Sequence, residues 1–131
     1  MRNRPPHDRV YARLGVSPIS GVGVFAIRDI PAGTDLFPND SRGVRWIDSV
    51  EIEAIAEPAI RQLYEDFAVR RGEKLGCPEN FNIMTVGWYL NEAPAGERPN
   101  VDVENNLRFT AARDIVTGEE LTIRYASFSD A

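Results

Sequence analysis

The sequence predicts a mostly β fold with a helical insert, and three observations support this prediction. Glycine and proline divide both ends of the chain into short segments in which apolar and polar residues alternate, as they do in strands. The middle of the chain instead carries apolar residues at helical spacing. The pattern Ala-x-Arg-Asp-Ile-x-x-Gly-x-x-Leu occurs twice, at residues 26–36 and 111–121, which indicates two similar hairpins.

The N-terminal part of the chain is expected to form three strands, at residues 10–16, 24–28 and 35–37. Prolines and glycines between residues 18 and 23, and again between 31 and 33, predict the turns that separate these strands. The next ten residues, 38–47, are rich in Pro, Asn, Asp, Ser and Gly and therefore predict a loop.

A helical insert is expected at residues 40–81. Asp48 or Ser49 can cap a first helix, and Pro58 either ends that helix or begins a second one. Gly72 is a plausible C-terminal stop for the second helix. The apolar residues at helical spacing are Ile52, Ile55, Ala56, Ile60, Leu63, Tyr64 and Phe67. This amphipathic insert is predicted to pack on the β-scaffold.

Strand character returns in the C-terminal part of the chain. The expected strands lie at residues 82–91, 101–103, 107–111 and 120–125. Asn105 and Asn106 can form a tight turn between the second and the third of these strands. The sequence thus predicts a single domain of residues 1–131, with a β-core of residues 10–39 and 82–128.

The repeated pattern predicts approximate internal symmetry in this β-core. In each copy the glycine, Gly33 or Gly118, can supply the positive φ that the turn needs. The isoleucine and leucine of each copy can pack inward. A chance similarity between two β-turns is the alternative interpretation.

Composition and charge exclude several classes of protein. The 131 residues are 43% hydrophobic and 27% charged, as in a globular domain, and no apolar run approaches the length of about 18 residues that a membrane span needs. The first residues lack the apolar stretch of a signal peptide, so we expect a cytoplasmic protein. The net charge of −5 argues against direct nucleic-acid binding and suits a basic partner, although solubility alone also explains it.

The inventory of reactive side chains excludes most catalytic machinery. His7 is the only histidine and Cys77 the only cysteine, so neither a histidine-based triad nor a common metal site is expected. The adjacent acids Glu119 and Glu120 are interpreted as solvated charges. Aromatic residues and backbone amides remain as chemical tools, and Tyr125 at the end of the last strand has the strongest case.

Three blocks occur in a characteristic order: GVGVFAIRDIPAGTDLF, WYLNEAPAGERPNV and FTAARDIVTGEELTIRY. Together they resemble a compact SET domain, the fold of most protein-lysine methyltransferases, which use S-adenosyl-L-methionine as methyl donor. The resemblance covers roughly residues 12–128. It implies a β-clip fold of short strands and hairpins that is closed by a C-terminal pseudoknot.

The resemblance also assigns roles to the residues that would hold the methyl donor. The backbone of Gly21, Val22 and Gly23 would meet it, although a plain tight turn also explains this Gly-x-Gly. Tyr89 would pack beside the adenosine, and Asn91 would bind the amino-acid end. Methyl transfer from a sulfonium needs no metal and no covalent intermediate, which agrees with the side chains present.

On the substrate side, the resemblance implies that Tyr125 orients the lysine amine and that Phe128 is a possible wall of the lysine channel. The family's Asn-His-Ser appears here as Asn91-Glu92-Ala93, and no cysteine-rich segment follows Tyr125. Two functions follow from this mixed pattern. The first is methyl transfer to a lysine of a basic protein, such as a histone-like or ribosomal protein, by a chain that could form a homodimer as minimal members of the family do. The second is a non-catalytic SET-like module that binds a protein or a small ligand.

Overall fold

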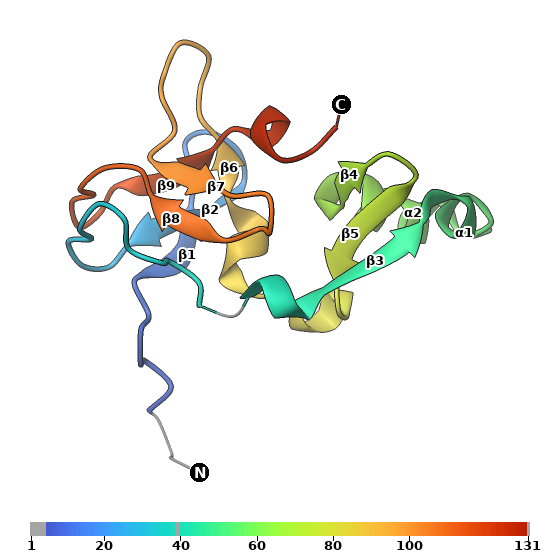
Figure 1. Cartoon of the computed structure of the whole chain (residues 1–131), viewed down its shortest axis with the longest axis horizontal. Helices are drawn as coiled ribbons and strands as arrows, with labels where there is room; N and C mark the ends of the chain where they lie inside the picture. Colours follow the sequence, from blue (N-terminus) through green and yellow to red (C-terminus); the bar gives the residue numbers. More distant parts are fainter. Residues whose placement is uncertain (1–4, 39, 131) are drawn as a thin grey trace.

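The computed structural model describes residues 5–38 and 40–130, which form short strands, two α-helices and several single helical turns (Figure 1). A four-stranded sheet lies at the centre of the β-core. Its strand order is β1 (Ala12–Val16), β2 (Val22–Ala26), β9 (Glu120–Ile123) and β6 (Asn91–Glu92). The predicted strands at 10–16 and 120–125 are present but shorter, since the first begins at Ala12 and the last ends at Ile123, and the predicted strand at 24–28 begins and ends two residues earlier.

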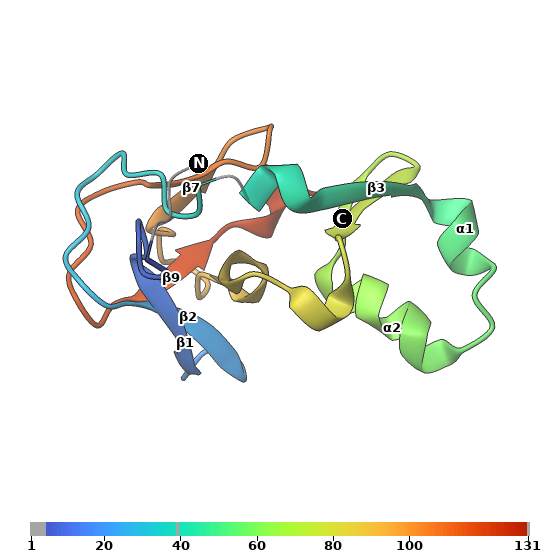
Figure 2. The ribbon, with the colours of Figure 1, turned by 90° about the horizontal axis from the view of Figure 1, so that it is seen from below.

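The closing strand β9 lies inside this sheet. It pairs antiparallel with β2 and parallel with β6, where Asn91 is opposite Thr122 and Glu92 is opposite Ile123. The last strand of the chain therefore runs between the N-terminal hairpin and residues 91–92, as the predicted pseudoknot requires. The view in Figure 2 shows β9 beside the β1–β2 hairpin.

The second part of the β-core is a two-stranded sheet of β7 (Val101–Val103) and β8 (Phe109–Ala111), as predicted. The turn between them includes Leu107, which has a φ of 62°. The predicted strand at residues 35–37 is reduced to one bridge, between Asp35 and Thr110.

The two copies of the repeat face each other across the β-core. Ile30 and Ile115 exchange both backbone hydrogen bonds, each at 2.8 Å. The Asp29 carboxylate accepts from the Thr117 amide, and the Asp114 carboxylate accepts from the Ala32 amide. Each bond in one copy therefore has its counterpart in the other, 85 residues away.

The repeated glycines have the predicted conformation. Gly33 has a φ of 85° and Gly118 a φ of 93°. Their amides donate to the carbonyls of Ala111 and Ala26 respectively, both at 2.8 Å. Internal symmetry, rather than a chance similarity of two turns, thus accounts for the repeat.

The insert, residues 40–81, contains a sheet as well as helices. Its elements are η1 (Asp40–Gly43), β3 (Val44–Asp48), α1 (Ser49–Glu53), α2 (Pro58–Phe67), β4 (Val69–Arg71) and β5 (Lys74–Pro78). The strands follow the order β3, β5, β4 and are all antiparallel. Pro58 is the first residue of α2, which confirms one of the two roles predicted for it.

Three predictions for the insert are wrong. Residues 44–48 form strand β3 and not a loop, because they pair along their whole length with β5. Gly72 does not end a helix: α2 ends at Phe67, and Gly72, with a φ of 60°, turns β4 into β5. Asp48 precedes α1 without capping it, since its carboxylate pairs with Lys74, opposite it across the sheet, at 2.6 Å.

The predicted strand at residues 82–91 is also wrong. This segment forms two short 3₁₀ turns, η2 (Phe81–Ile83) and η3 (Val86–Tyr89), before β6. The Phe81 ring lies edge-on to Tyr64 of α2, with ring centres 5.1 Å apart, and Tyr89 lies edge-on to Phe67 at 5.8 Å. Aromatic contacts with the insert therefore determine the path of this segment in place of strand pairing.

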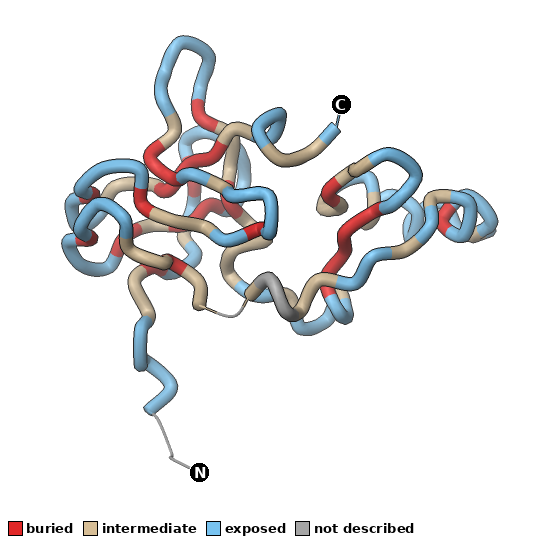
Figure 3. The backbone as a smooth tube through the Cα atoms, in the orientation of Figure 1, coloured by how far each residue is buried: buried red, intermediate tan, exposed pale blue. Residues whose placement is uncertain are grey.

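Two separate groups of buried residues stabilise the molecule, as Figure 3 indicates. The larger group lies in the β-core and includes Val24, Ile30, Ile115 and Leu121, each at most 1% exposed. The smaller group, in the insert, consists of Ile52, Leu75 and Cys77. Among the described residues, neither helix has the length or hydropathy of a membrane span.

Candidate functional site

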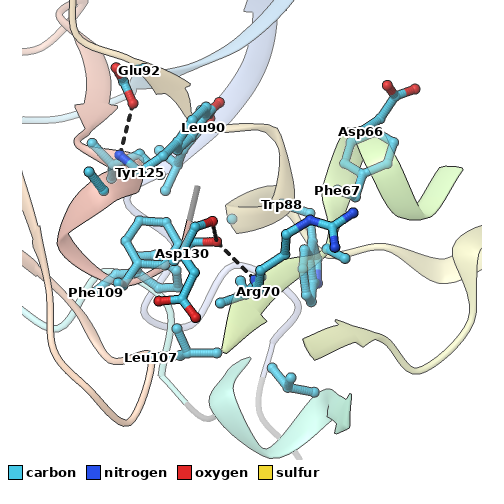
Figure 4. A pocket seen from close by; sticks show the side chains of 18 of the residues that line it. Asp66, Phe67, Arg70, Trp88, Leu90, Glu92, Leu107, Phe109, Tyr125 and Asp130 are labelled. Atoms are coloured by element: carbon cyan, nitrogen blue, oxygen red, sulfur yellow. Dashed lines mark hydrogen bonds between the residues drawn. The ribbon is translucent and has the colours of Figure 1, made fainter. Parts of the chain in front are cut away.

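A cavity of about 470 Å³ lies where the β-core meets the insert (Figure 4). Phe67, Asp66 and Arg70 line it from the insert. The apolar residues that line it from the β-core and the C-terminal segment are Trp88, Leu90, Leu107, Phe109, Ile123 and Phe128. The cavity also receives the side chain of Tyr125, so it is the place where a substrate can meet this phenol.

Tyr125 lies two residues after the end of β9 and begins the short turn η4 (Tyr125–Ser127). Its hydroxyl donates to the Leu90 carbonyl at 3.0 Å, and its amide donates to the Glu92 carboxylate at 2.9 Å. Burial raises the pKa of Tyr125 above its ordinary value, and the negative charge of Glu92 acts in the same direction. The phenol therefore keeps its proton at neutral pH.

Phe128 and the residues after it close the cavity on a third side. The Phe128 ring lies edge-on to Tyr125, with ring centres 6.3 Å apart. Ser129 accepts from the Arg70 amide at 2.8 Å, and the Asp130 amide donates to the Arg70 carbonyl at 2.7 Å. The C-terminal segment thus joins the β-core to the edge of strand β4.

The Gly-x-Gly loop contacts Asn91. The Asn91 side-chain NH₂ lies within 3.0–3.2 Å of the Ser20 carbonyl, the Val22 carbonyl, the Ser17 hydroxyl and the Glu120 carboxylate. Asn91 therefore anchors the loop to β6.

Local structure explains why glycine occupies both positions of this loop. Gly21 has a φ of 43°, in the left-handed region that suits glycine. A side chain at Gly23 would overlap a carboxylate oxygen of Glu120. The same carboxylate accepts from the Ser17 hydroxyl at 2.8 Å. Glu120 is consequently part of a hydrogen-bonded cluster, and its interpretation as a solvated charge is wrong.

Tyr89 lies apart from this cluster. Its hydroxyl contacts the sulfur of Met84 at 3.9 Å, and its ring packs against Phe67 of the insert. The structure thus brings Gly21–Gly23 and Asn91 together, and separately Tyr125 and Phe128.

Strand β6 connects the two groups, since successive side chains of a strand point to opposite faces. Asn91 points to the Gly-x-Gly loop, whereas Glu92 points to the backbone of Tyr125. Ser17, Glu120 and the side-chain roles of Glu92 were not predicted from sequence. The hydrogen-bond partners of the Glu120 and Glu92 carboxylates lie 29 or more residues away along the chain, so no local pattern reveals them.

Cys77 lies outside the cavity, buried in the insert. Burial raises the pKa of its thiol to about 11, so the thiol stays protonated near neutral pH and is a poor nucleophile. Within residues 5–38 and 40–130, no three His, Cys, Asp or Glu side chains are arranged to hold a metal ion.

A protein-family model described as the SET domain matches residues 21–126 of this chain. No curated protein matches the sequence.

Two solved structures have a similar fold. A Plasmodium falciparum protein described as a candidate histone methyltransferase is 20% identical, with a TM-score of 0.56 over 88% of this chain and 93% of that one. A humanized mutant of the Chaetomium thermophilum Polycomb Repressive Complex 2, bound to the inhibitor GSK126, is 22% identical with a TM-score of 0.59. That match covers 93% of this chain but only 16% of the other. At these identities the likeness establishes the fold alone.

Proposed function

Because the chain belongs to the SET-domain family, we propose that it transfers a methyl group from S-adenosyl-L-methionine to the ε-amine of a lysine in a protein substrate. The observation that carries this proposal is the environment of Tyr125. Its phenol lines the cavity between β-core and insert, and its hydroxyl proton is directed to the Leu90 carbonyl.

Tyr125 would orient the substrate amine. With its proton donated to Leu90, the hydroxyl oxygen keeps lone pairs that can accept an N–H from a neutral amine. A fixed acceptor of this kind aligns the amine lone pair for an in-line displacement. The apolar walls, which include Phe109 and Phe128, would exclude water and favour the neutral form of the lysine.

The cluster around Asn91 fits the methyl donor. S-adenosyl-L-methionine supplies an electrophilic methyl group on a sulfonium and also carries an ammonium group. The Glu120 carboxylate and the carbonyls of Ser20 and Val22 form an acceptor-rich environment, which suits a cation. Within the described part of the chain, the Asn91 side-chain oxygen accepts no hydrogen bond, so it is free to accept one from a ligand. Gly21, Val22, Gly23 and Asn91 would hold the donor.

A basic substrate suits the charge of the cavity. Five acidic residues line it, and Arg70 is its one basic residue among those described. Asp40, Asp66 and Asp130 form no ion pair with described residues, so their charges are available to a cationic partner. We therefore propose a Lys/Arg-rich protein segment, as in histone-like or ribosomal proteins. The role of Tyr89 beside the adenosine, a cytoplasmic location and a homodimer stay predictions.

Calorimetry followed by a transfer assay tests the proposal. S-adenosyl-L-methionine is titrated into the protein, and labelled donor is then supplied with Lys/Arg-rich peptides. The Tyr125→Phe variant should bind the donor within about twofold of the wild type but transfer methyl at least about tenfold more slowly, because the phenol oxygen is lost. Tyr11→Phe, whose ring lies under Arg28, is the matched control and should leave transfer unchanged.

The alternative function is a non-catalytic module that binds a protein or a small ligand, and the glutamate at residue 92 favours it. Under this alternative, the titration gives no heat at millimolar donor. Transfer by Tyr125→Phe at the wild-type rate would remove Tyr125 from the mechanism.

A further inference from the structure

Tyr125 is held at its two ends by residues of one short segment. Its hydroxyl donates to the carbonyl of Leu90, and its amide donates to the side chain of Glu92. Leu90 is 3% exposed and belongs to the main buried cluster, so packing fixes the carbonyl that accepts from the Tyr125 hydroxyl. The position of the Tyr125 amide depends on a single carboxylate, that of Glu92, which Figure 4 shows with its hydrogen bond to Tyr125.

The carboxylate of Glu92 has a separate partner for each oxygen. One oxygen accepts from the Tyr125 amide at 2.9 Å, and the other lies 3.3 Å from the Arg124 guanidinium. Arg124 in turn donates to the carbonyls of Ala93 at 3.3 Å and Glu97 at 2.8 Å. The charge of Glu92 is therefore already paired inside the chain, and this argues against a role in binding a cationic substrate.

We propose that Glu92 is a positioning residue, which anchors the segment after β9 to β6 so that the Tyr125 phenol stays in the cavity. This inference rests on the proposed methyl transfer. In the described residues no other acceptor meets the Tyr125 amide, and Tyr125 is 45% exposed, so without Glu92 its amide would face water. The amide that bonds Glu92 and the hydroxyl that bonds the Leu90 carbonyl both belong to Tyr125. If the backbone of Tyr125 moved, its hydroxyl would therefore move away from the Leu90 carbonyl.

Two variants separate hydrogen bonding from charge. Glu92→Ala removes the acceptor, whereas Glu92→Gln keeps a carbonyl oxygen in its place without the negative charge. Glu97→Ala is the matched control, since it removes a nearby exposed carboxylate whose side chain does not touch Tyr125. If circular dichroism shows that Glu92→Ala does not fold, Glu92→Asp replaces it, since its carboxylate is one methylene shorter.

Amide hydrogen exchange of Tyr125, followed by NMR, is the first measurement. Exchange should be about tenfold faster in Glu92→Ala, as expected for the loss of one hydrogen bond to a charged group. It should stay within about threefold of the wild type in Glu92→Gln and be unchanged in Glu97→Ala. This measurement needs neither donor nor substrate, so its result is independent of the proposed function.

Steady-state kinetics provide the second measurement. Glu92→Ala should lower kcat about tenfold with little change in the KM for peptide or in donor affinity, and Glu92→Gln should restore most of kcat. Unchanged exchange in Glu92→Ala would overturn the inference. So would an equal loss in Glu92→Gln and Glu92→Ala, because the effect would then be one of charge. Absence of methyl transfer in the wild type, with the exchange results as expected, would instead reject the proposed function.

Discussion

The β-core and the insert differ in how much apolar surface holds each of them together. Among the described residues, eleven buried side chains form the cluster of the β-core, and three form that of the insert. The insert is connected to the β-core by aromatic contacts of Phe67 and by the C-terminal segment along Arg70. Because local stability follows buried apolar contacts, the insert should open more readily than the β-core.

This difference separates two tasks at the cavity. The groups placed next to the proposed chemistry, Tyr125, Leu90 and Glu92, belong to the β-core or follow directly from it. Two of the acidic residues that would meet a basic partner, Asp40 and Asp66, belong to the insert. A firmly packed region thus holds the phenol, and a less stable region faces the partner.

The largest effect is expected from truncating the two clusters in turn. Ile115→Ala, at a side chain 1% exposed, should lower the free energy of unfolding of the whole chain by about 3 to 4 kcal/mol. Leu75→Ala, at a side chain 2% exposed, should cost about 2 to 3 kcal/mol, confined mainly to residues 44–78. Urea unfolding by circular dichroism gives the global value, and amide exchange by NMR gives the local one.

The control for these truncations is Val116→Ala. Val116 is next to Ile115 but 60% exposed, so its truncation should change stability by less than about 0.5 kcal/mol. If Leu75→Ala accelerated exchange equally in the β-core and the insert, the two regions would be one cooperative unit and the comparison would fail.

The β-core was largely predictable from sequence because its signals are local. The two copies of the repeat predict the inward packing of Ile30 and Ile115 and the turns at Gly33 and Gly118, since turn geometry and alternation are encoded within a few residues. The 82–91 segment was not predictable in this way. Its apolar residues resemble those of a strand, but contacts such as that of Tyr89 with Phe67 give it a helical path.

The candidate site was predictable only in part, and mainly through family resemblance. Asn91, the Gly-x-Gly loop and Tyr125 were assigned to the site because a family motif includes them, and their roles stay predictions. Glu120 was misread because its partner Ser17 is 103 residues away. Contacts of that span depend on how β9 enters the sheet, which is a property of the whole fold.

A smaller effect is expected at the repeated glycines. It tests whether the two equivalent turns of the β-core contribute equally to the free energy of unfolding. Gly33→Ala and Gly118→Ala should each cost about 1 to 2 kcal/mol, because alanine resists a left-handed backbone. Neither site has an atom within 4 Å of the added methyl, so the cost comes from the backbone alone. Urea unfolding of both variants is the measurement, and Gly43→Ala, equally uncrowded without a left-handed φ, is the control. Costs that differ by more than about 1 kcal/mol would show that the two turns are not equivalent.

The smallest effect is expected at Asp40, at the junction of the two regions. Burial raises the pKa of this carboxyl above its ordinary value, the Thr85 hydroxyl opposes the rise, and the charge of Asp35 adds to it. Between the ordinary and the raised pKa the folded chain therefore binds more protons than the unfolded chain, so stability falls as the pH rises through this window. At neutral pH the carboxylate is a net cost.

Asp40→Asn should remove this cost while keeping an oxygen that can accept from Thr85, 2.8 Å away in the wild type. The variant should therefore be slightly more stable than the wild type at pH 7, and its advantage should shrink as the pH falls through the raised pKa of Asp40, where the carboxylate regains its proton. Urea unfolding at a series of pH values measures the difference, with the exposed Asp102→Asn as control. If the gain in free energy of unfolding did not change with pH, it would have to come from packing. The charge of Asp40 would then not be what weakens the junction.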